Sequence, residues 1–231
     1  MGGKSCLEGA ALIPIVIIAD DHPLFRDALR QAISGAIPDC KVEMVGDLDG
    51  LRKLLNEISS ADLVLLDLSM PGSSGFSGLI SIRAEFPETP VVVVSASEDT
   101  ITIKKCIELG ASGFIPKSSG TEYIVDGIKS VQSGEVWVPP NIDLDTDMDA
   151  ESAEIIGKLQ SLTPQQTRVL SMLGEGLLNK QIAYELDVSE ATVKAHVSAV
   201  LLKLDVDSRT QAVIIMNKIG SGFLESAVSA D

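Results

Sequence analysis

Four short apolar runs in the first half of the chain each end at a polar side chain with useful chemistry. The runs at residues 15–19, 63–66, 91–94 and 114–116 lead, in that order, into Asp20 with Asp21, Asp67, Ser95 and Lys117. Runs of this length and β-branched content are typical of strands buried on both faces of a parallel sheet. The carboxyl ends of such strands meet at one edge, where doubly wound folds hold their ligands. The sequence therefore predicts that these polar side chains converge.

Three of the converging groups are carboxylates, from Asp20, Asp21 and Asp67. Crowded carboxylates repel one another unless a cation joins them. Mg²⁺ binds oxygen ligands, usually one or two carboxylates together with water and phosphate. We therefore expect a Mg²⁺ site beside one reactive aspartate. A lone Asp after a strand often only caps a turn or helix, so the prediction depends on the complete set.

Strand and helix patterns alternate over residues 15–133. The strand patterns cover residues 15–19, 42–46, 63–67, 91–95 and 112–115, with helical patterns between them and after the last. Such alternation implies right-handed crossovers and a parallel sheet. We expect an α/β domain over residues 13–136 with a five-stranded, doubly wound parallel sheet of the flavodoxin-like kind.

Two adjacent prolines, Pro139 and Pro140, interrupt this alternation, and six acidic residues follow between positions 143 and 154. This composition predicts a solvated acidic linker over residues 137–160. Spaced carboxylates also suggest a calcium loop. The glycine and the closing glutamate of that pattern are missing, which argues against calcium.

Only helical patterns follow residue 161. Pro164 and Gln166 suit the first turn of a helix and a capping box. Residues expected to cap four successive helices are Thr163, Asn179, Ser189 and Ser208. We therefore expect a separate all-α domain of four helices over residues 161–222.

Charge and cysteine content limit the setting in which the chain works. The net charge of −15 argues against broad, sequence-independent coating of nucleic acid. Residues 161–231, with six basic and eight acidic side chains, are the least acidic part and leave room for a small DNA-reading patch.

Three widely spaced cysteines form no disulfide or zinc pattern, which favours a reducing cytoplasm. The apolar stretch at residues 10–19 is too short to span a membrane.

Residues 15–133 resemble the receiver domain of response regulators. The resemblance rests on ordered features, namely Asp20-Asp21, Asp67 followed by Met70-Pro71-Gly72, Ser95, and Ile115-Pro116-Lys117. It implies that Asp67 accepts a phosphoryl group from a histidine kinase. It also implies that Asp21, Asp67 and the backbone carbonyl of Ser69 ligate Mg²⁺, with Asp20 acting through a metal-bound water.

Phosphoryl transfer requires in-line positioning and neutralisation of charge on the equatorial oxygens. Mg²⁺ would take one oxygen, Lys117 a second and the Ser95 hydroxyl a third. Phe114 has two interpretations: an aromatic residue on a strand is more often part of the core, whereas receivers use this position as a switch that moves inward.

Residues 161–218 resemble the LuxR-type helix-turn-helix domain. The residues that carry the resemblance are Leu162-Thr163-Pro164, Asn179-Lys180-Gln181-Ile182-Ala183, the run from Val188 to His196, Lys203-Leu204 and Ser208-Arg209. The third helix has an apolar stripe opposite a face that fits the major groove. The resemblance implies DNA contacts from Asn179, Lys180, Thr192, Lys194, Ala195, His196 and Ser198. His196 remains open to a structural role.

Together the two resemblances imply a phosphorylation-controlled transcription regulator of the NarL/FixJ-like kind, without enzymatic turnover. Few lysines face the phosphates, so we expect a homodimer on paired half-sites. One alternative is a regulator whose DNA binding ignores phosphorylation. Another is a Mg²⁺-dependent phosphatase with an aspartyl-phosphate intermediate. Haloacid-dehalogenase-like phosphatases need a second Asp two residues after the nucleophile, where this chain has Ser69.

Overall fold

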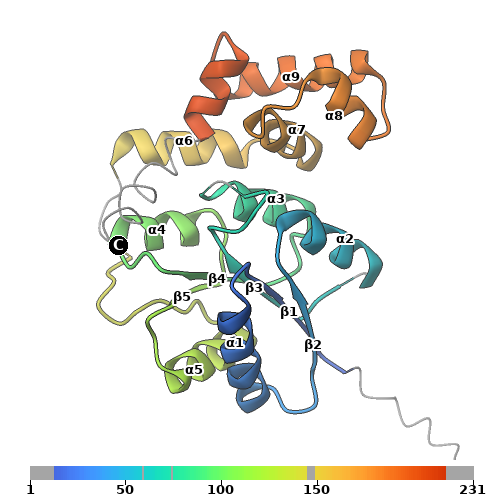
Figure 1. Ribbon diagram of the computed structural model, residues 1–231. Helices are drawn as coiled ribbons and strands as arrows, with labels where there is room; N and C mark the ends of the chain where they lie inside the picture. Colours follow the sequence, from blue (N-terminus) through green and yellow to red (C-terminus); the bar gives the residue numbers. More distant parts are fainter. Residues whose placement is uncertain (1–12, 59, 74, 145–148, 217–231) are drawn as a thin grey trace, which may run out of the picture.

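The computed structural model describes residues 13–58, 60–73, 75–144 and 149–216. Its N-terminal part contains a five-stranded parallel sheet with the order β2-β1-β3-β4-β5 (Figure 1). The strands are β1 (Ile15–Ala19), β2 (Lys41–Val45), β3 (Leu63–Asp67), β4 (Val91–Ser95) and β5 (Gly113–Pro116). The predicted doubly wound sheet is confirmed, with β2 shifted one residue earlier and β5 one residue later. The strand order reverses between β1 and β3, the strands that carry Asp20 and Asp67 at their ends.

Helices cover both faces of the sheet. Two helices, α1 (Pro23–Ala36) and α5 (Thr121–Gln132), pack together on one face. The other face is covered by α2 (Leu48–Ile58), α3 (Ser77–Glu85) and α4 (Thr100–Glu108). Successive residues of each strand therefore enter opposite cores. On β3, Leu63 and Leu65 belong to the core under α1 and α5, whereas Val64 and Leu66 belong to the other core. Burial on both sides explains why β1, β3 and β4 are apolar runs up to their polar ends, whereas the edge strand β2 carries Lys41 and Glu43.

The segment after α5 is more structured than its acidic composition predicts. Trp137 extends the sheet edge, since the N–H of Phe114 donates to its carbonyl at 2.7 Å and its ring lies 5.3 Å from that of Tyr123. Farther along, α6 (Ala150–Gln160) forms where we expected a solvated linker. Asp149 caps this helix through the N–H of Ser152, so the last of the spaced aspartates begins a helix. The buried residues of α6 are Ile155, Ile156 and Leu159.

The C-terminal part contains α7 (Pro164–Gly174), α8 (Asn179–Glu185) and α9 (Glu190–Leu204), and residues 209–216 are helical again. The all-α expectation is confirmed over the described residues, while positions 217–222 lie outside them. The capping box of Thr163 and Gln166 and the Ser189 cap are present. The expected Asn179 cap is wrong. Leu178 occupies the N-cap position, and its N–H is satisfied by the Gln181 side chain at 2.8 Å.

The helical domain lies on the α2, α3 and α4 side of the sheet (Figure 1). There α7 packs against α3, and one apolar cluster continues from the receiver-like core into α6, α7 and α9. Within the described ranges, no helix combines the length and the apolar character needed to cross a bilayer.

Candidate functional site

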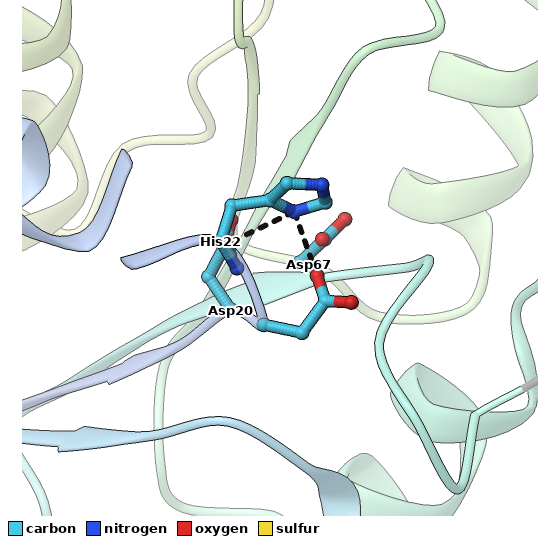
Figure 2. A group of neighbouring side chains, drawn as sticks. Asp20, His22 and Asp67 are labelled. Carbon is cyan, nitrogen blue, oxygen red and sulfur yellow. Dashed lines mark hydrogen bonds and ion pairs between the residues drawn. The ribbon is translucent and has the colours of Figure 1, made fainter. Parts of the chain in front are cut away.

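The polar residues at the strand ends come together as the sequence predicts. Asp20 follows β1, Asp67 ends β3 and Lys117 follows β5, and both carboxylates are almost fully buried. The Lys117 Nζ lies 2.8 Å from Asp20 Oδ2 and 2.8 Å from Asp67 Oδ2. Asp20 and Asp67 come from the ends of neighbouring strands, and Figure 2 shows them grouped with His22. One cation therefore bridges two buried anions.

Asp67 combines burial with a small number of stabilising contacts. Its Oδ1 accepts a hydrogen bond of 3.1 Å from the N–H of Ser69, and its Oδ2 accepts one from Lys117. Burial raises the pKa of Asp67, and the hydrogen bond from Lys117 offsets that rise only in part. A bound divalent cation stabilises the ionised form of a neighbouring carboxylate and so favours the nucleophilic anion.

Lys117 stays charged in this environment. Burial alone lowers the pKa of Lys117, but the hydrogen bonds to Asp20 and Asp67 and the charges of these two carboxylates together outweigh burial, so the net shift is upward. The Nζ of Lys117 also lies 5.0 Å from the centre of the Phe25 ring, so the two side chains make a cation–π contact. Lys117 therefore places a positive charge beside Asp67.

His22 is a member of the site that sequence reasoning missed. Its Nδ1 lies 2.7 Å from Asp21 Oδ1 and 3.4 Å from Asp20 Oδ1. Its backbone N–H donates to Asp20 Oδ1 at 2.7 Å, so Asp20 also supports the start of α1. The sequence signal that could have identified His22 is its position, because it directly follows the paired aspartates and precedes Pro23 at the start of α1.

The residues present fit a magnesium ion. One ligand atom from each of Asp20, Asp21, His22 and Asp67 lies within 4.8 Å of the others. Three of these are carboxylate oxygens, the ligands that Mg²⁺ prefers. A cavity of about 460 Å³ opens beside them. Its lining consists of His22, Leu24, Phe25, Asp67, Ser69, Ala96 and Lys117. Asp67 and Lys117 therefore both line a cavity at the carboxyl edge of the sheet.

Ser95 and Phe114 lie on the two strands beyond Asp67. Ser95 ends β4, next to β3, and is fully buried, with its Oγ accepting from the N–H of Ser97 at 3.2 Å. Its backbone carbonyl accepts from the N–H of Lys117 at 2.7 Å, which ties the two strand ends together. Phe114 is fully buried on β5. This burial is expected of a core residue, and the role of Phe114 as a switch stays a prediction.

The expected DNA-reading face is accessible. On α9, Lys194, Ala195 and Ser198 are exposed, whereas Val193, Val200 and Leu204 are buried. Lys194 pairs with Glu190 one turn earlier at 3.0 Å. The helix therefore presents a short polar face opposite its apolar stripe, the shape that enters a major groove.

The remaining predicted DNA contacts surround this face. Thr192 shares a 2.8 Å hydrogen bond with Ser189 at the start of α9, and His196 is half-buried between the stripe and the open face. Lys180 is exposed and Asn179 half-buried in the first turn of α8. The N-termini of both helices add exposed N–H groups suited to phosphate.

Comparison with known proteins agrees with both halves of this description. The response regulator receiver domain family matches residues 16–129, and the family of bacterial regulatory proteins of the LuxR type matches residues 160–216. The glycerol metabolism activator of Pseudomonas putida is 44% identical over 205 residues, covering 86% of this chain and 93% of that protein. The nitrate/nitrite response regulator NarL of Escherichia coli is 32% identical, covering 86% and 93%.

Solved structures show the same two-part fold. RcsB of Salmonella enterica serovar Typhimurium, in a structure bound to a promoter, superimposes with a TM-score of 0.51 at 24% identity, covering 88% of this chain and 97% of RcsB. The receiver geometry, the exposed α9 face and the relatives that match along most of the chain lead to one assignment. The protein belongs to the response regulators that join a receiver domain to a LuxR-type DNA-binding domain and regulate transcription.

Proposed function

We propose that Asp67 accepts a phosphoryl group from the phosphohistidine of a sensor kinase and that this modification controls DNA binding by the α9 helix. The observation that carries the proposal is Lys117, whose Nζ lies 2.8 Å from Oδ2 of both Asp67 and Asp20. In the transfer, a carboxylate oxygen of Asp67 forms the new bond to phosphorus while the bond from phosphorus to the histidine nitrogen breaks. Lys117 then faces the negative charge that arrives on the phosphoryl oxygens.

The other site residues take supporting roles in this proposal. Asp20, Asp21, Asp67 and the Ser69 carbonyl would hold Mg²⁺, which supplies charge neutralisation for the equatorial oxygens. His22 orients Asp21 through their 2.7 Å contact. The Ser95 hydroxyl, now engaged with the N–H of Ser97, exchanges that contact for the phosphoryl group. Phe114 then changes its packing on β5 in response to this exchange.

We propose no enzymatic turnover. A phosphatase that works through an aspartyl phosphate needs a second acid to protonate the leaving group, and Ser69 occupies the corresponding position. Steady hydrolysis of p-nitrophenyl phosphate over many turnovers would contradict this assignment.

DNA is read from the major groove in this proposal. Lys194 and Ala195 contact base edges, while Asn179, Lys180, Thr192, His196 and Ser198 contact the backbone. Two phosphorylated copies bind paired half-sites, because one domain offers few cations for phosphates. Binding DNA requires a compartment that contains it, and the three widely spaced cysteines favour a compartment that keeps thiols reduced. We therefore place the protein in the cytoplasm.

The test is Asp67→Asn, which keeps shape but removes the nucleophile. Acetyl phosphate with Mg²⁺ should add one phosphoryl group to the parent protein, detected as a mass increase, and none to the variant. Phosphodonor should tighten binding to a DNA site selected from random duplexes only for the parent. Asp126→Asn on exposed α5 is the matched control and should behave like the parent. Undiminished stimulation of DNA binding in Asp67→Asn would refute the proposal.

A further inference from the structure

One buried carboxylate contacts arginines of both domains. Glu85, the last residue of α3, places Oε1 at 3.1 Å from Arg52 Nε and Oε2 at 3.5 Å from Arg168 Nε. Arg52 lies on α2 of the receiver, whereas Arg168 lies on α7 of the DNA-binding domain. Ser81 donates to the same Oε1 at 2.8 Å and accepts from Arg52 at 2.6 Å. The Glu85 side chain is 9% exposed, so solvent screens these contacts only weakly.

Apolar packing continues between the domains but leaves two partly open pockets. A cavity of about 250 Å³ is bounded by Ile80 and Leu109 of the receiver and by Leu159 and Leu162 of the helical part. A smaller one, of about 160 Å³, separates Gly72, Ser73 and Ser77 from the end of α7. Both pockets are partly open to solvent, so the apolar side chains that line them are only partly removed from water. The polar contacts at Glu85 therefore carry more of the docking than they would at a tightly packed interface.

One further polar contact fixes the orientation of the helical part. Gln160, at the end of α6, donates its side-chain N–H to the backbone carbonyl of Glu108 at 2.7 Å. Glu108 ends α4, where helix carbonyls lack partners within the helix. The contacts at Glu85 and Glu108 lie on different receiver helices, and two such points resist rotation of the docked domain.

Docking leaves the DNA-reading face uncovered. Figure 1 shows α7 between α3 and α9, so α9 lies on the side of the domain away from the receiver. Lys194, Ala195 and Ser198 are all exposed in this arrangement. The interdomain contact thus constrains where the reading helix points without blocking it.

We propose that Glu85 acts as an ionic clamp that holds the DNA-binding domain in one orientation on α3 while its reading face stays open. The clamp sets the direction of the reading helix, and through it the geometry of paired half-sites, instead of hiding the helix. Its formation does not depend on the phosphoryl transfer proposed above. Both of the variants described below keep Asp67 and should still take up one phosphoryl group from acetyl phosphate, so failure of the clamp is distinguishable from failure of the proposed function.

The first experiment removes the contact that Glu85 makes with the DNA-binding domain. Arg168→Ala leaves Glu85 paired with Arg52, so no buried charge is left without a partner, and Arg168→Glu adds repulsion. Small-angle X-ray scattering of the full chain should show the radius of gyration rising by roughly 3 Å or more in Arg168→Glu, above the compact value of about 17 Å for this length, and by less in Arg168→Ala. Arg30→Ala removes an exposed ion pair on α1 and should change nothing. An unchanged radius in Arg168→Glu overturns the clamp.

The second experiment asks whether docking hides α9. Cys6, Cys40 and Cys106 are replaced by alanine, Ala195→Cys is added, and the rate of maleimide labelling is measured with and without Arg168→Glu. An open face predicts equal rates within twofold. A tenfold faster reaction after charge reversal would mean that docking covers the reading face, and would overturn that half of the proposal.

Discussion

Lys117 and Asp67, separated by fifty positions in sequence, are joined by a 2.8 Å contact between Nζ and Oδ2 at the carboxyl edge of the sheet. Asp20 shares the same cation at the same distance. A buried site with two anions and one cation carries an excess negative charge, and this imbalance underlies the first three predictions.

Lys117→Ala should destabilise the metal-free protein. The substitution leaves Asp20 and Asp67 buried without their cation, which costs about 3 kcal/mol for a buried pair that loses one member. Urea unfolding without metal measures the loss, and saturating Mg²⁺ should restore part of it. Lys129→Ala on exposed α5 is the control, with an expected change below about 0.5 kcal/mol. Equal stability of the two variants would contradict the bridging role.

Stability should depend on pH through Asp67. Burial raises its pKa, with partial compensation from Lys117, so the folded state binds the proton more tightly than the unfolded state does. The stability this provides is complete below the unfolded pKa and is lost as pH rises through the folded pKa. Asp67→Asn should remove this component, making the variant at least as stable as the parent at neutral pH without metal. Urea unfolding across the mildly acidic range checks the sign. If this carboxyl instead stabilises the parent as the pH rises to neutral, the predicted sign of the pH dependence is wrong.

Mg²⁺ should raise the melting temperature by binding only the folded state. At a concentration one hundred times its Kd, the ion adds about 2.7 kcal/mol to the free energy of unfolding. Asp21→Asn removes a carboxylate that is one-third exposed beside the cavity and should abolish most of the shift. Asp27→Asn on α1, outside the cluster, should keep it. Retention of the full shift in Asp21→Asn would exclude Asp21 as a ligand.

Lys194→Ala should weaken binding to the selected DNA site by about 1–3 kcal/mol if the side chain reads a base edge. Folding should be unaffected, because the Glu190 pair that it removes is exposed. Fluorescence anisotropy at several salt concentrations separates the roles. Loss of sequence preference indicates base reading, whereas a uniform loss with a smaller salt slope indicates a phosphate contact. Lys180→Ala should show the second pattern.

The sequence predicted the site more fully than it predicted the connections between elements. Asp20, Asp67 and Lys117 were predictable because parallel strands bring their carboxyl ends to one edge, a local pattern with a topological consequence. His22 was missed because its role depends on the direction of one side chain after the strand ends. The α6 helix was missed because six carboxylates dominate the composition, whereas three buried apolar side chains decide the structure.

Docking between the domains was beyond sequence reasoning for a different reason. Glu85, Arg52 and Arg168 lie on three helices with no shared periodicity, and their pairing exists only once the tertiary arrangement is formed. The predicted Asn179 cap was wrong for a more local reason. Gln181 satisfies the N–H of Leu178, so Leu178 is the N-cap and the helix begins at Asn179, one residue earlier than an Asn179 cap requires.

The short helix α3 joins the two chemically active regions of the molecule. The chain leaves Asp67, turns, and enters a nine-residue rod that ends at Glu85. A rod of that length spans roughly 13 Å and does not bend appreciably over so few turns. A displacement of the first turn of α3 would therefore move Glu85, and its contact with Arg168, by nearly the same distance. The stretch of chain from Asp67 to Glu85 therefore has the acidic pocket at one end and the contact with the DNA-binding domain at the other.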